Sequence, residues 1–285
     1  MLLPATLFVL IYNYGSMLGV VIAFEKFIPP KGIFGSQWVG LANFQNLFSM
    51  PGIWQIIRNT VTISLFKMIG GILVPVVFAL LLNELSLLPL KRTYQTMVYL
   101  PNFLSWIILA GIFHDVLSPS SGVVNQLLGK LGIEPIFFLG NPAWFPGTMV
   151  VTDIWKGFGF GSVIYLSALT SIDPALYESA MIDGAGRWKQ TLHITLPGIQ
   201  SIVILMTVLS MGSILNGGFD QIYNMYSPAV METGDILDTF VFRLGILQTQ
   251  YALSTAAGLF KSLVSLVFIL ISYWLADRFA GYRVF

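Results

Sequence analysis

The chain has 285 residues, of which 56% are hydrophobic and only 9% are charged, and its formal net charge at pH 7 is +1. Ordinary soluble domains carry about 25% charged residues, and a soluble protein of this size could not cover its surface with so few charges. The composition, with a mean hydropathy of +0.80, therefore excludes an ordinary soluble enzyme, a disordered chain and a nucleic-acid-binding protein, and it indicates that lipid surrounds most of the molecule.

Six apolar stretches are each long enough to cross the core of a bilayer, which needs roughly 20 residues of helix. Their apolar runs are continuous rather than alternating, which favours helices over the strands of a β-barrel. The sequence therefore predicts an all-α integral membrane protein, with a single transmembrane domain over residues 1–285. The expected helices lie near residues 2–24, 53–82, 93–117, 147–170, 198–217 and 256–279.

The first stretch lacks the basic start and the small-residue cleavage site of a signal peptide, so we expect it to be retained as a membrane helix. Whether a cytoplasmic tail precedes it is left open. Lysine and arginine in the connecting segments indicate the orientation. With the N-terminus inside, the inner segments hold Lys91, Arg92, Arg187, Lys189, Arg278 and Arg283, and the outer segments hold Lys26, Lys31, Lys130 and Arg243. We therefore predict that both termini are cytoplasmic.

The connections between the stretches differ in length and character. The three outer connections, 25–52, 118–146 and 219–255, are long and contain Pro, Gly and Asn turn signals. The first inner connection, 83–92, is short. The second, 171–197, is long, mixed in charge and helical in pattern, and this sets it apart from an ordinary loop.

The inner segment 171–197 carries clear helix boundaries. Asp173 is expected to cap a helix that begins at Pro174, and Gly184 is typical of a helix C-terminus. A second short helix is expected over 187–193, and Pro197 is expected to open the fifth membrane helix. The pattern predicts a helix–turn–helix at the inner membrane face, suited to a groove on a partner protein. From the residues alone, a solvated loop with an incidental helix is an equally good interpretation.

Three short motifs in this segment change that balance. Glu178-Ser179-Ala180 is followed after two residues by Asp183-Gly184-Ala185, and after eight more by Ile194-Thr195-Leu196-Pro197. This spacing resembles the EAA loop of ATP-binding-cassette (ABC) importer permeases, with a serine in place of the first alanine. The resemblance implies that residues 171–197 are a cytoplasmic coupling loop that docks on an ATPase subunit. The coupling residues implied are Glu178, Ser179, Ala180, Asp183, Gly184, Ala185, Arg187, Ile194, Leu196 and Pro197.

The resemblance extends over most of the chain. It includes Tyr14-Gly15-Ser16-Met17, Ile22-Ala23-Phe24, Gly35-Ser36-Gln37-Trp38-Val39-Gly40, Asn43-Phe44, Asn59-Thr60 and Tyr99-Leu100-Pro101. These segments are similar to the polysaccharide and oligosaccharide branch of the maltose-permease-like carbohydrate importers. The family implies six membrane helices in the MetI-like fold of type I importers, transport by alternating access, and a place in the bacterial cytoplasmic membrane.

The same resemblance implies the partners. A second, homologous permease completes a heterodimer, two cytoplasmic ABC ATPase subunits bind ATP and Mg²⁺, and an extracytoplasmic solute-binding protein delivers the sugar. The chain itself contains no G-x-x-x-x-G-K-[ST] motif, so we expect it to bind no nucleotide and to be no enzyme. With no cysteine and two histidines, we expect no thiolate or histidine metal site either.

Ionisable residues inside membrane helices are costly and mark candidate functional sites. Asp153 and Lys156 are three residues apart, which favours an ion pair on one helix face, and the neighbouring Trp155 suits the stacking of a sugar ring. The candidate pathway residues are Lys67, Asn102, Trp106, Asp153, Trp155, Lys156 and Asn216. Structural alternatives remain, since Lys67 is long enough to snorkel and Gly157, Gly159 and Gly161 suit helix packing.

The sequence thus predicts the transmembrane subunit of a sugar importer, most simply for an oligosaccharide, and Lys67 and Lys156 keep an acidic, uronate-type sugar among the candidates. One alternative is an ABC permease for a non-sugar solute. Another is a secondary transporter driven by an ion gradient, for which Asp153 is the one carboxylate placed well inside a stretch. An intramembrane enzyme is disfavoured, because the sequence shows no nucleophile or metal constellation.

Overall fold

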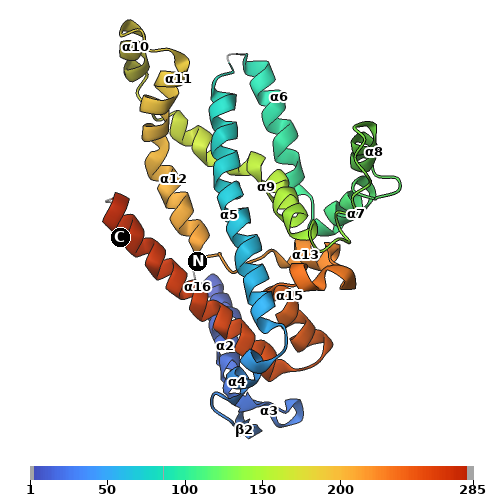
Figure 1. The fold of residues 1–285 in the computed structure, drawn as a ribbon. Coiled ribbons are helices and arrows are strands. Elements are labelled where there is room, and N and C mark those ends of the chain that lie inside the picture. Colours follow the sequence, from blue (N-terminus) through green and yellow to red (C-terminus); the bar gives the residue numbers. More distant parts are fainter. Residues whose placement is uncertain (1–2, 86, 281–285) are drawn as a thin grey trace.

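The computed structural model describes residues 3–85 and 87–280, and these residues form helices almost throughout, with one two-stranded hairpin (Figure 1). The first half contains α1 (Leu3–Val9), η1 (Leu10–Tyr14), α2 (Gly15–Met17), η2 (Leu18–Phe24), β1 (Glu25–Lys26), η3 (Pro29–Lys31), α3 (Gly32–Gly35), β2 (Gln37–Trp38), α4 (Ala42–Ser49), α5 (Ile53–Asn83), α6 (Leu88–Tyr99), η4 (Leu100–Phe103), α7 (Trp106–Val116) and α8 (Val123–Lys130). The second half contains α9 (Phe145–Leu169), α10 (Pro174–Ile182), α11 (Arg187–Gln190), η5 (Thr191–Thr195), α12 (Leu196–Met211), α13 (Phe219–Met225), η6 (Pro228–Val230), α14 (Met231–Gly234), α15 (Leu237–Phe242), η7 (Arg243–Leu247) and α16 (Tyr251–Ala280).

Within the described residues, four helices are long and apolar enough to cross a membrane: Leu3–Phe24, Ile53–Asn83, Arg187–Met211 and Tyr251–Arg278. A fifth span arises if the bent pair Leu88–Phe103 and Trp106–Val116 is counted as one. The predicted count of six spans is therefore not confirmed. The helix that falls short is α9, which has 25 residues but carries glycines, serines and two charged residues that lower its hydropathy.

The first predicted helix is confirmed over Leu3–Phe24, whereas residue 2 lies outside the described residues. It changes from α to π and back, and it ends as a 3₁₀-helix before the hairpin that pairs β1 with antiparallel β2. The N-terminal end of this helix and the C-terminal end of α16 both point away from the end of the molecule that carries β2 and toward the end that carries α10 (Figure 1). Arg283, used above in judging the orientation, also lies outside the described residues.

The third predicted helix is wrong as a single helix, because α7 turns away from the α6–η4 segment by 106°. The physical reason lies in the sequence of the break. Pro101 lacks a backbone N–H and sits in the short 3₁₀ turn, Leu104 is extended, and the Ser105 hydroxyl caps the new helix by accepting the Ile108 N–H at 3.4 Å.

The prediction for the fifth helix is wrong at both ends. The chain is helical without interruption over Arg187–Met211, so Pro197 does not open a new helix. A π-helical turn, η5, directly precedes α12 and widens the backbone where the proline ring needs room. At the other end the helix stops at Met211, and residues 212–218, here named the connector, run without a regular helix to α13.

The centre of the molecule is the contact between α5 and α9, the most extensive between any two elements. Gly159 touches the Val98 backbone, where a Cβ atom would collide with it, and a Cβ on Gly161 would lie 3.3 Å from the Pro75 ring. The packing interpretation is thus confirmed for these two glycines. It is wrong for Gly157, which has open space around its Cα. The α5–α9 pair positions both the polar cavity and the outer network described next.

Candidate functional site

Residues 171–197, here named the coupling loop after their predicted role, form the predicted helix–turn–helix. The Asp173 carboxylate caps α10 by accepting the Ala175 N–H at 2.9 Å. At the other end of α10, Gly184 has φ +75°, and the N–H groups of Gly184 and Ala185 donate to Met181 and Ala180 at 3.1 and 2.8 Å. This is a Schellman motif, which needs a residue that adopts the left-handed conformation without strain. Gly184 is therefore required by the geometry of the turn.

Two hydrogen bonds fix the turn onto the long helix that follows. The hydroxyls of Tyr177 and Thr195 lie 3.0 Å apart, and the Gln190 side chain donates to the Ala185 carbonyl at 2.8 Å. The first bond joins α10 directly to the helix Arg187–Met211 and the second joins the turn to it, so the two arms of the loop are held together. A force applied to α10 is then transmitted to that helix.

The surface of the coupling loop presents large apolar side chains to its surroundings. Ile182 is 87% exposed and Trp188 is 78% exposed. Exposed apolar groups gathered among charged residues are typical of a surface that binds another protein. Besides these two, the patch includes the exposed Leu176, Met181 and Leu192.

The predicted coupling residues divide by exposure. Six of them are exposed, namely Glu178, Ser179, Asp183, Gly184, Arg187 and Pro197, and four are half-buried, namely Ala180, Ala185, Ile194 and Leu196. Sequence reasoning missed Glu84, whose carboxylate lies 3.4 Å from the Arg187 guanidinium. It also missed Ile182, although its spacing of four residues from Glu178 on a predicted helix was a usable signal.

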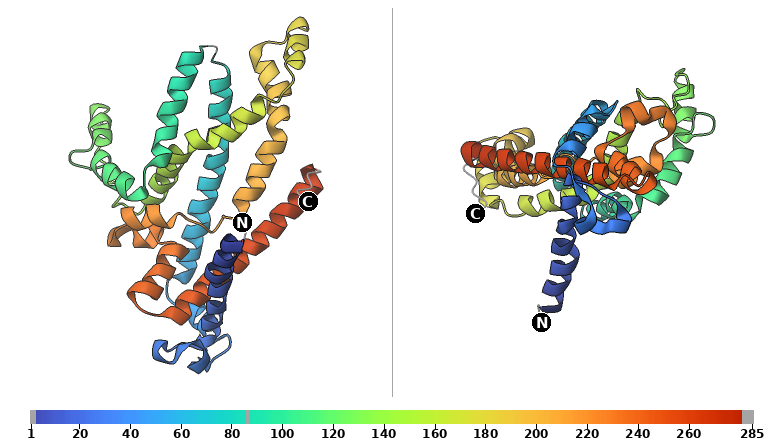
Figure 2. Two further views of the ribbon diagram at one scale, coloured as in Figure 1. Left: turned by 180° about the vertical axis from the view of Figure 1, so that it is seen from behind. Right: turned by 90° about the horizontal axis from the view of Figure 1, so that it is seen from below.

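A polar cavity of about 230 Å³ lies between α5, α9 and the region around the connector. In the left view of Figure 2 the connector passes across α5 on its way from α12 to α13. Hydroxyl, amide and charged side chains from all three regions meet here. The polar cavity is lined by Ser64, Lys67, Met68, Gly71, Asp153, Ser210, Ser213, Ile214, Asn216 and Gly218.

Lys67 is the best-enclosed charge at the polar cavity, with 8% of its side chain exposed. Its ammonium donates to the Gly217 carbonyl at 2.8 Å and to the side-chain oxygen of Gln221, and it lies 3.6 Å from the Asp153 carboxylate. The snorkelling alternative is therefore wrong for Lys67. The expected Asp153–Lys156 pair is also wrong, because in the described chain Asp153 is paired with Lys67 instead.

Gln221 extends this contact into α9. Its side-chain nitrogen donates to the Met149 carbonyl at 2.8 Å and to the Thr152 hydroxyl at 2.7 Å. Nothing in the sequence around Gln221 signals this role, since its partners are more than 60 residues away. On the α5 side, the buried Ser64 hydroxyl has no hydrogen-bond partner within the described residues, so the lining of the polar cavity includes a free hydroxyl.

The remaining pathway candidates are not among the residues that line the polar cavity in the described chain. The Lys156 ammonium sits 4.9 Å from the centre of the Trp106 ring, a cation–π contact, and Trp155 packs edge-on against Phe113 at 5.6 Å. Asn102 lies in η4, before the bend. The structure thus brings Lys67, Asp153 and Asn216 to one cavity, and it places Asn102, Trp106, Trp155 and Lys156 by α6 and α7.

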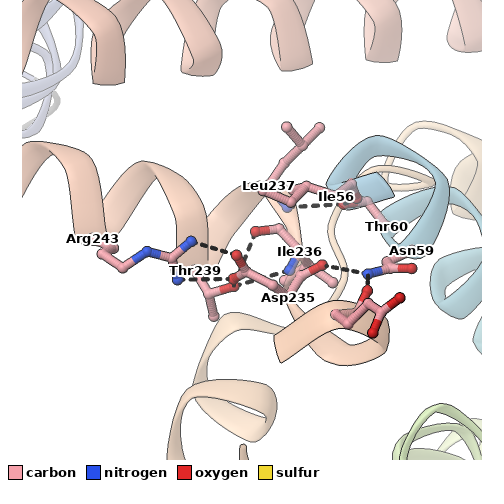
Figure 3. A network of polar contacts seen from close by, with 9 residues as sticks. Ile56, Asn59, Thr60, Asp235, Ile236, Leu237, Thr239 and Arg243 are labelled. Atoms are coloured by element: carbon pink, nitrogen blue, oxygen red, sulfur yellow. Dashed lines mark hydrogen bonds and ion pairs between the residues drawn. The ribbon is translucent and has the colours of Figure 1, made fainter. Parts of the chain in front are cut away.

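A second polar cluster, here named the outer network because segment 219–255 is predicted to lie on the outer side, joins the start of α5 to the α14–α15 segment (Figure 3). The Asn59 amide donates to the carbonyls of Glu232 and Asp235 at 2.9 and 3.2 Å, and the Thr60 hydroxyl accepts the Leu237 N–H at 2.8 Å. Asp235 is buried and ion-paired with Arg243. The hydrogen bond from Arg243 to Asp235 raises the pKa of that guanidinium above its usual range.

The chain resembles known proteins in both sequence and fold. Residues 71–281 match the family model described as "Binding-protein-dependent transport system inner membrane component". The chain is 38% identical, over 279 residues, to the polygalacturonan/rhamnogalacturonan transport system permease protein YteP of Bacillus subtilis, and the alignment covers 98% of this chain and 87% of that protein.

Solved structures agree with the sequence comparison. A chain of a bacterial ABC transporter involved in the import of the acidic polysaccharide alginate has a TM-score of 0.90 and 39% identity, with 98% of this chain and 94% of that chain covered. The bacterial alginate ABC transporter in complex with an alginate pentasaccharide-bound periplasmic protein gives a TM-score of 0.91 at 38% identity, covering 100% and 95%. At this identity the likeness shows a shared fold and a common origin.

Proposed function

The chain belongs to the family of binding-protein-dependent transport system inner membrane components, and from that premise we propose that it is the transmembrane subunit of an ABC importer for an acidic oligosaccharide. The fold shared with the alginate transporters supports the importer. The substrate class is supported by what the similar proteins handle, since alginate and polygalacturonan are both polymers of uronic acids.

The observation that carries the proposal is the coupling loop. An exposed apolar patch at one end of the molecule is hydrogen-bonded onto a 25-residue helix, Arg187–Met211, roughly 37 Å long. The other end of that helix leads into the connector, whose Gly217 carbonyl is held by Lys67. A movement of the patch therefore also moves the wall of the polar cavity. An importer requires such a mechanical connection to couple ATP hydrolysis to transport.

The partners follow from this arrangement. We assign the coupling residues Glu178, Ala180, Asp183 and Gly184 to contacts with one of two cytoplasmic ATPase subunits, which bind ATP and Mg²⁺. A second, homologous permease supplies the other half of the pathway, and an extracytoplasmic binding protein delivers the sugar, as the periplasmic protein in the alginate complex supports. Both termini are assigned to the cytoplasmic side, because the helix Leu3–Phe24 and α16 extend toward the coupling-loop end (Figure 1).

The polar cavity is assigned to the transport pathway. Serine hydroxyls and the Asn216 amide offer donors and acceptors for sugar hydroxyls. The one lysine in its lining is paired with Asp153, so this half of the pathway is close to electrically neutral. The same pairing disfavours the secondary-transporter alternative, because a carboxylate held in an ion pair is a poor proton relay.

Uptake by proteoliposomes tests the proposal. The chain, assembled with its partner subunits and binding protein, is expected to import α-1,4-linked galacturonate oligomers only when ATP is supplied. Trp188→Ala removes the large exposed ring of the patch and is expected to lower uptake at least about tenfold, as for an interface hot spot. Trp274→Ala, which removes an exposed tryptophan of α16, is the matched control.

Two results would overturn the proposal. Uptake driven by a proton gradient without ATP would replace the importer with a secondary transporter. If the complex imported neutral oligosaccharides in an ATP-dependent manner but no galacturonate oligomers, it would still be an importer, and the acidic substrate class would be wrong.

A further inference from the structure

A second cavity lies between α13, α15 with η7, and the beginning of α16, all in or next to the outer connection 219–255. It encloses about 430 Å³, and Asn216 lines it as well as the polar cavity. The two cavities are therefore adjacent along the chain's outer side. This second one, named here the aromatic cavity, is lined by the rings of Phe219, Phe242 and Tyr251.

The rings of the aromatic cavity are held in place by one another. Phe219 stacks on Tyr223, with ring centres 5.2 Å apart and planes 18° apart, and Phe242 packs against both at 5.1 and 5.0 Å. Packing of this kind fixes ring orientation before any ligand arrives, which reduces the entropy lost on binding.

Polar groups stand beside the rings. Asn216 is exposed at the junction of the two cavities. Asp238 lines the aromatic cavity and pairs with Lys261 through one carboxylate oxygen, while the other oxygen, Oδ2, is buried without a hydrogen-bond partner in the described chain. An unpaired buried acceptor is unfavourable, and a hydroxyl donor would relieve it. A lipid tail has no such donor, whereas a sugar has several.

We propose that the aromatic cavity is an outer subsite that holds one pyranose ring of the transported oligosaccharide while the neighbouring unit occupies the polar cavity. The inference rests on the proposed function and adds to it a second, aromatic contact. The C–H face of the ring lies on Phe219 and Phe242, and Asn216 and Asp238 bond its hydroxyls. The positive charge of Lys261 neutralises the negative charge of Asp238. This subsite therefore recognises the pyranose ring and the length of the oligosaccharide rather than the charge of the sugar carboxylate.

Chain length is the variable that tests this subsite. An oligomer of two or more units spans both cavities and gains from the aromatic contact, whereas a single galacturonate can occupy the polar cavity alone. We expect Phe242→Leu to raise the KM for uptake of hexagalacturonate about tenfold, with less than a twofold change for monomeric galacturonate. Phe242→Tyr keeps the ring and is expected to keep the KM. Phe158→Leu is the matched control, because Phe158 makes a similar edge-on contact with Phe78 away from this cavity.

Other results overturn the inference. Equal losses for the hexamer and the monomer at equal amounts of assembled complex would show that the rings only support the fold or contact a lipid or the partner permease. No change for either substrate would show that the cavity is not used. Both results leave wild-type uptake intact and are therefore compatible with the proposed function. If the wild-type complex imported no galacturonate oligomer, both the proposed substrate class and this subsite would be wrong.

Discussion

Two ion pairs of the same chemistry stand near opposite ends of the molecule and differ in how far the chain encloses them. In the outer network, Asp235 and Arg243 have 5% and 22% of their side chains exposed. In the coupling region, Glu84 and Arg187 have 48% and 82% exposed. The first pair is surrounded by hydrogen bonds from other parts of the chain, and the second is open to its surroundings.

The difference in exposure indicates that the outer pair belongs to a structure completed within this chain, whereas the pair in the coupling region lies on a surface open to a partner protein. At the outer end, named for the side of the membrane predicted for it, α5 is bonded to the α14–α15 segment by hydrogen bonds that span more than 170 residues of sequence. At the inner end, likewise named for its predicted side, the exposed apolar patch of the coupling loop has no comparable cover within the described residues. The outer end therefore acts as a rigid anchor for α5, and the inner end is where another protein can act on the chain.

The largest expected effect comes from breaking the enclosed pair. Asp235→Ala leaves the half-buried Arg243 charge without its partner and removes the buried carboxylate that accepts the Thr239 hydroxyl at 2.7 Å. Removing one partner of a buried pair lowers the free energy of unfolding by about 3–5 kcal/mol. Thermal or denaturant unfolding of the purified chain in detergent measures this loss. Glu232→Ala, an exposed acid three residues earlier, is the control, and equal stability of the two variants would contradict the account.

The second largest effect is expected at the inner end, where a substitution in the turn of the coupling loop should reduce transport rather than stability. Gly184→Val forces a β-branched residue to φ +75°, whereas Gly186→Val sits at φ −70°, which any residue adopts. A Cβ atom added at either position would meet no other atom within 4 Å, so the pair compares backbone strain at two open positions. We expect Gly184→Val to lower ATP-driven uptake at least about tenfold, because the strained turn reshapes the docking surface. Uptake is expected to be unchanged in Gly186→Val.

Parallel assays of ATP hydrolysis by the assembled complex show where the Gly184→Val defect lies. Hydrolysis that continues while uptake is lost means that the chain no longer transmits the motion of the ATPase. Wild-type uptake by Gly184→Val, at wild-type amounts in the membrane, would contradict the requirement for the Schellman turn.

What the sequence predicts well is local. The cap at Asp173, the glycine at 184 and the motif spacing of the coupling loop lie within 25 residues of one another, and the structure confirms the helix–turn–helix there. The bend at Leu104–Ser105 escaped prediction, although Pro101 and Ser105 are visible signals, because the apolar run continues through them and dominates a hydropathy argument.

Prediction failed where the partners of a residue are distant in sequence. Lys67 looked able to snorkel because its own helix offers it no partner, and its partners come from residues 153, 217 and 221. The spacing of Asp153 and Lys156 suggested an ion pair between them. In the structure, α7 turns back so that Trp106 contacts the Lys156 ammonium, and Asp153 forms its ion pair with Lys67. Such choices are made by packing between helices, which local spacing does not encode.

The smallest effect on stability is expected at the exposed Glu84–Arg187 pair. Its measurement distinguishes a pair that stabilises the fold from one that contacts a partner protein. Arg187→Ala and Glu84→Ala should each change the free energy of unfolding by less than about 0.5 kcal/mol, because an exposed ion pair contributes little. If Arg187 also contacts the ATPase, then Arg187→Ala will weaken co-purification of that subunit and Glu84→Ala will not. Equal weakening would mean that the pair acts as a unit to position α11. A stability loss above about 1 kcal/mol in either variant would show that the inner end, like the outer one, is fixed by the chain itself, and the contrast between anchor and docking end would no longer hold.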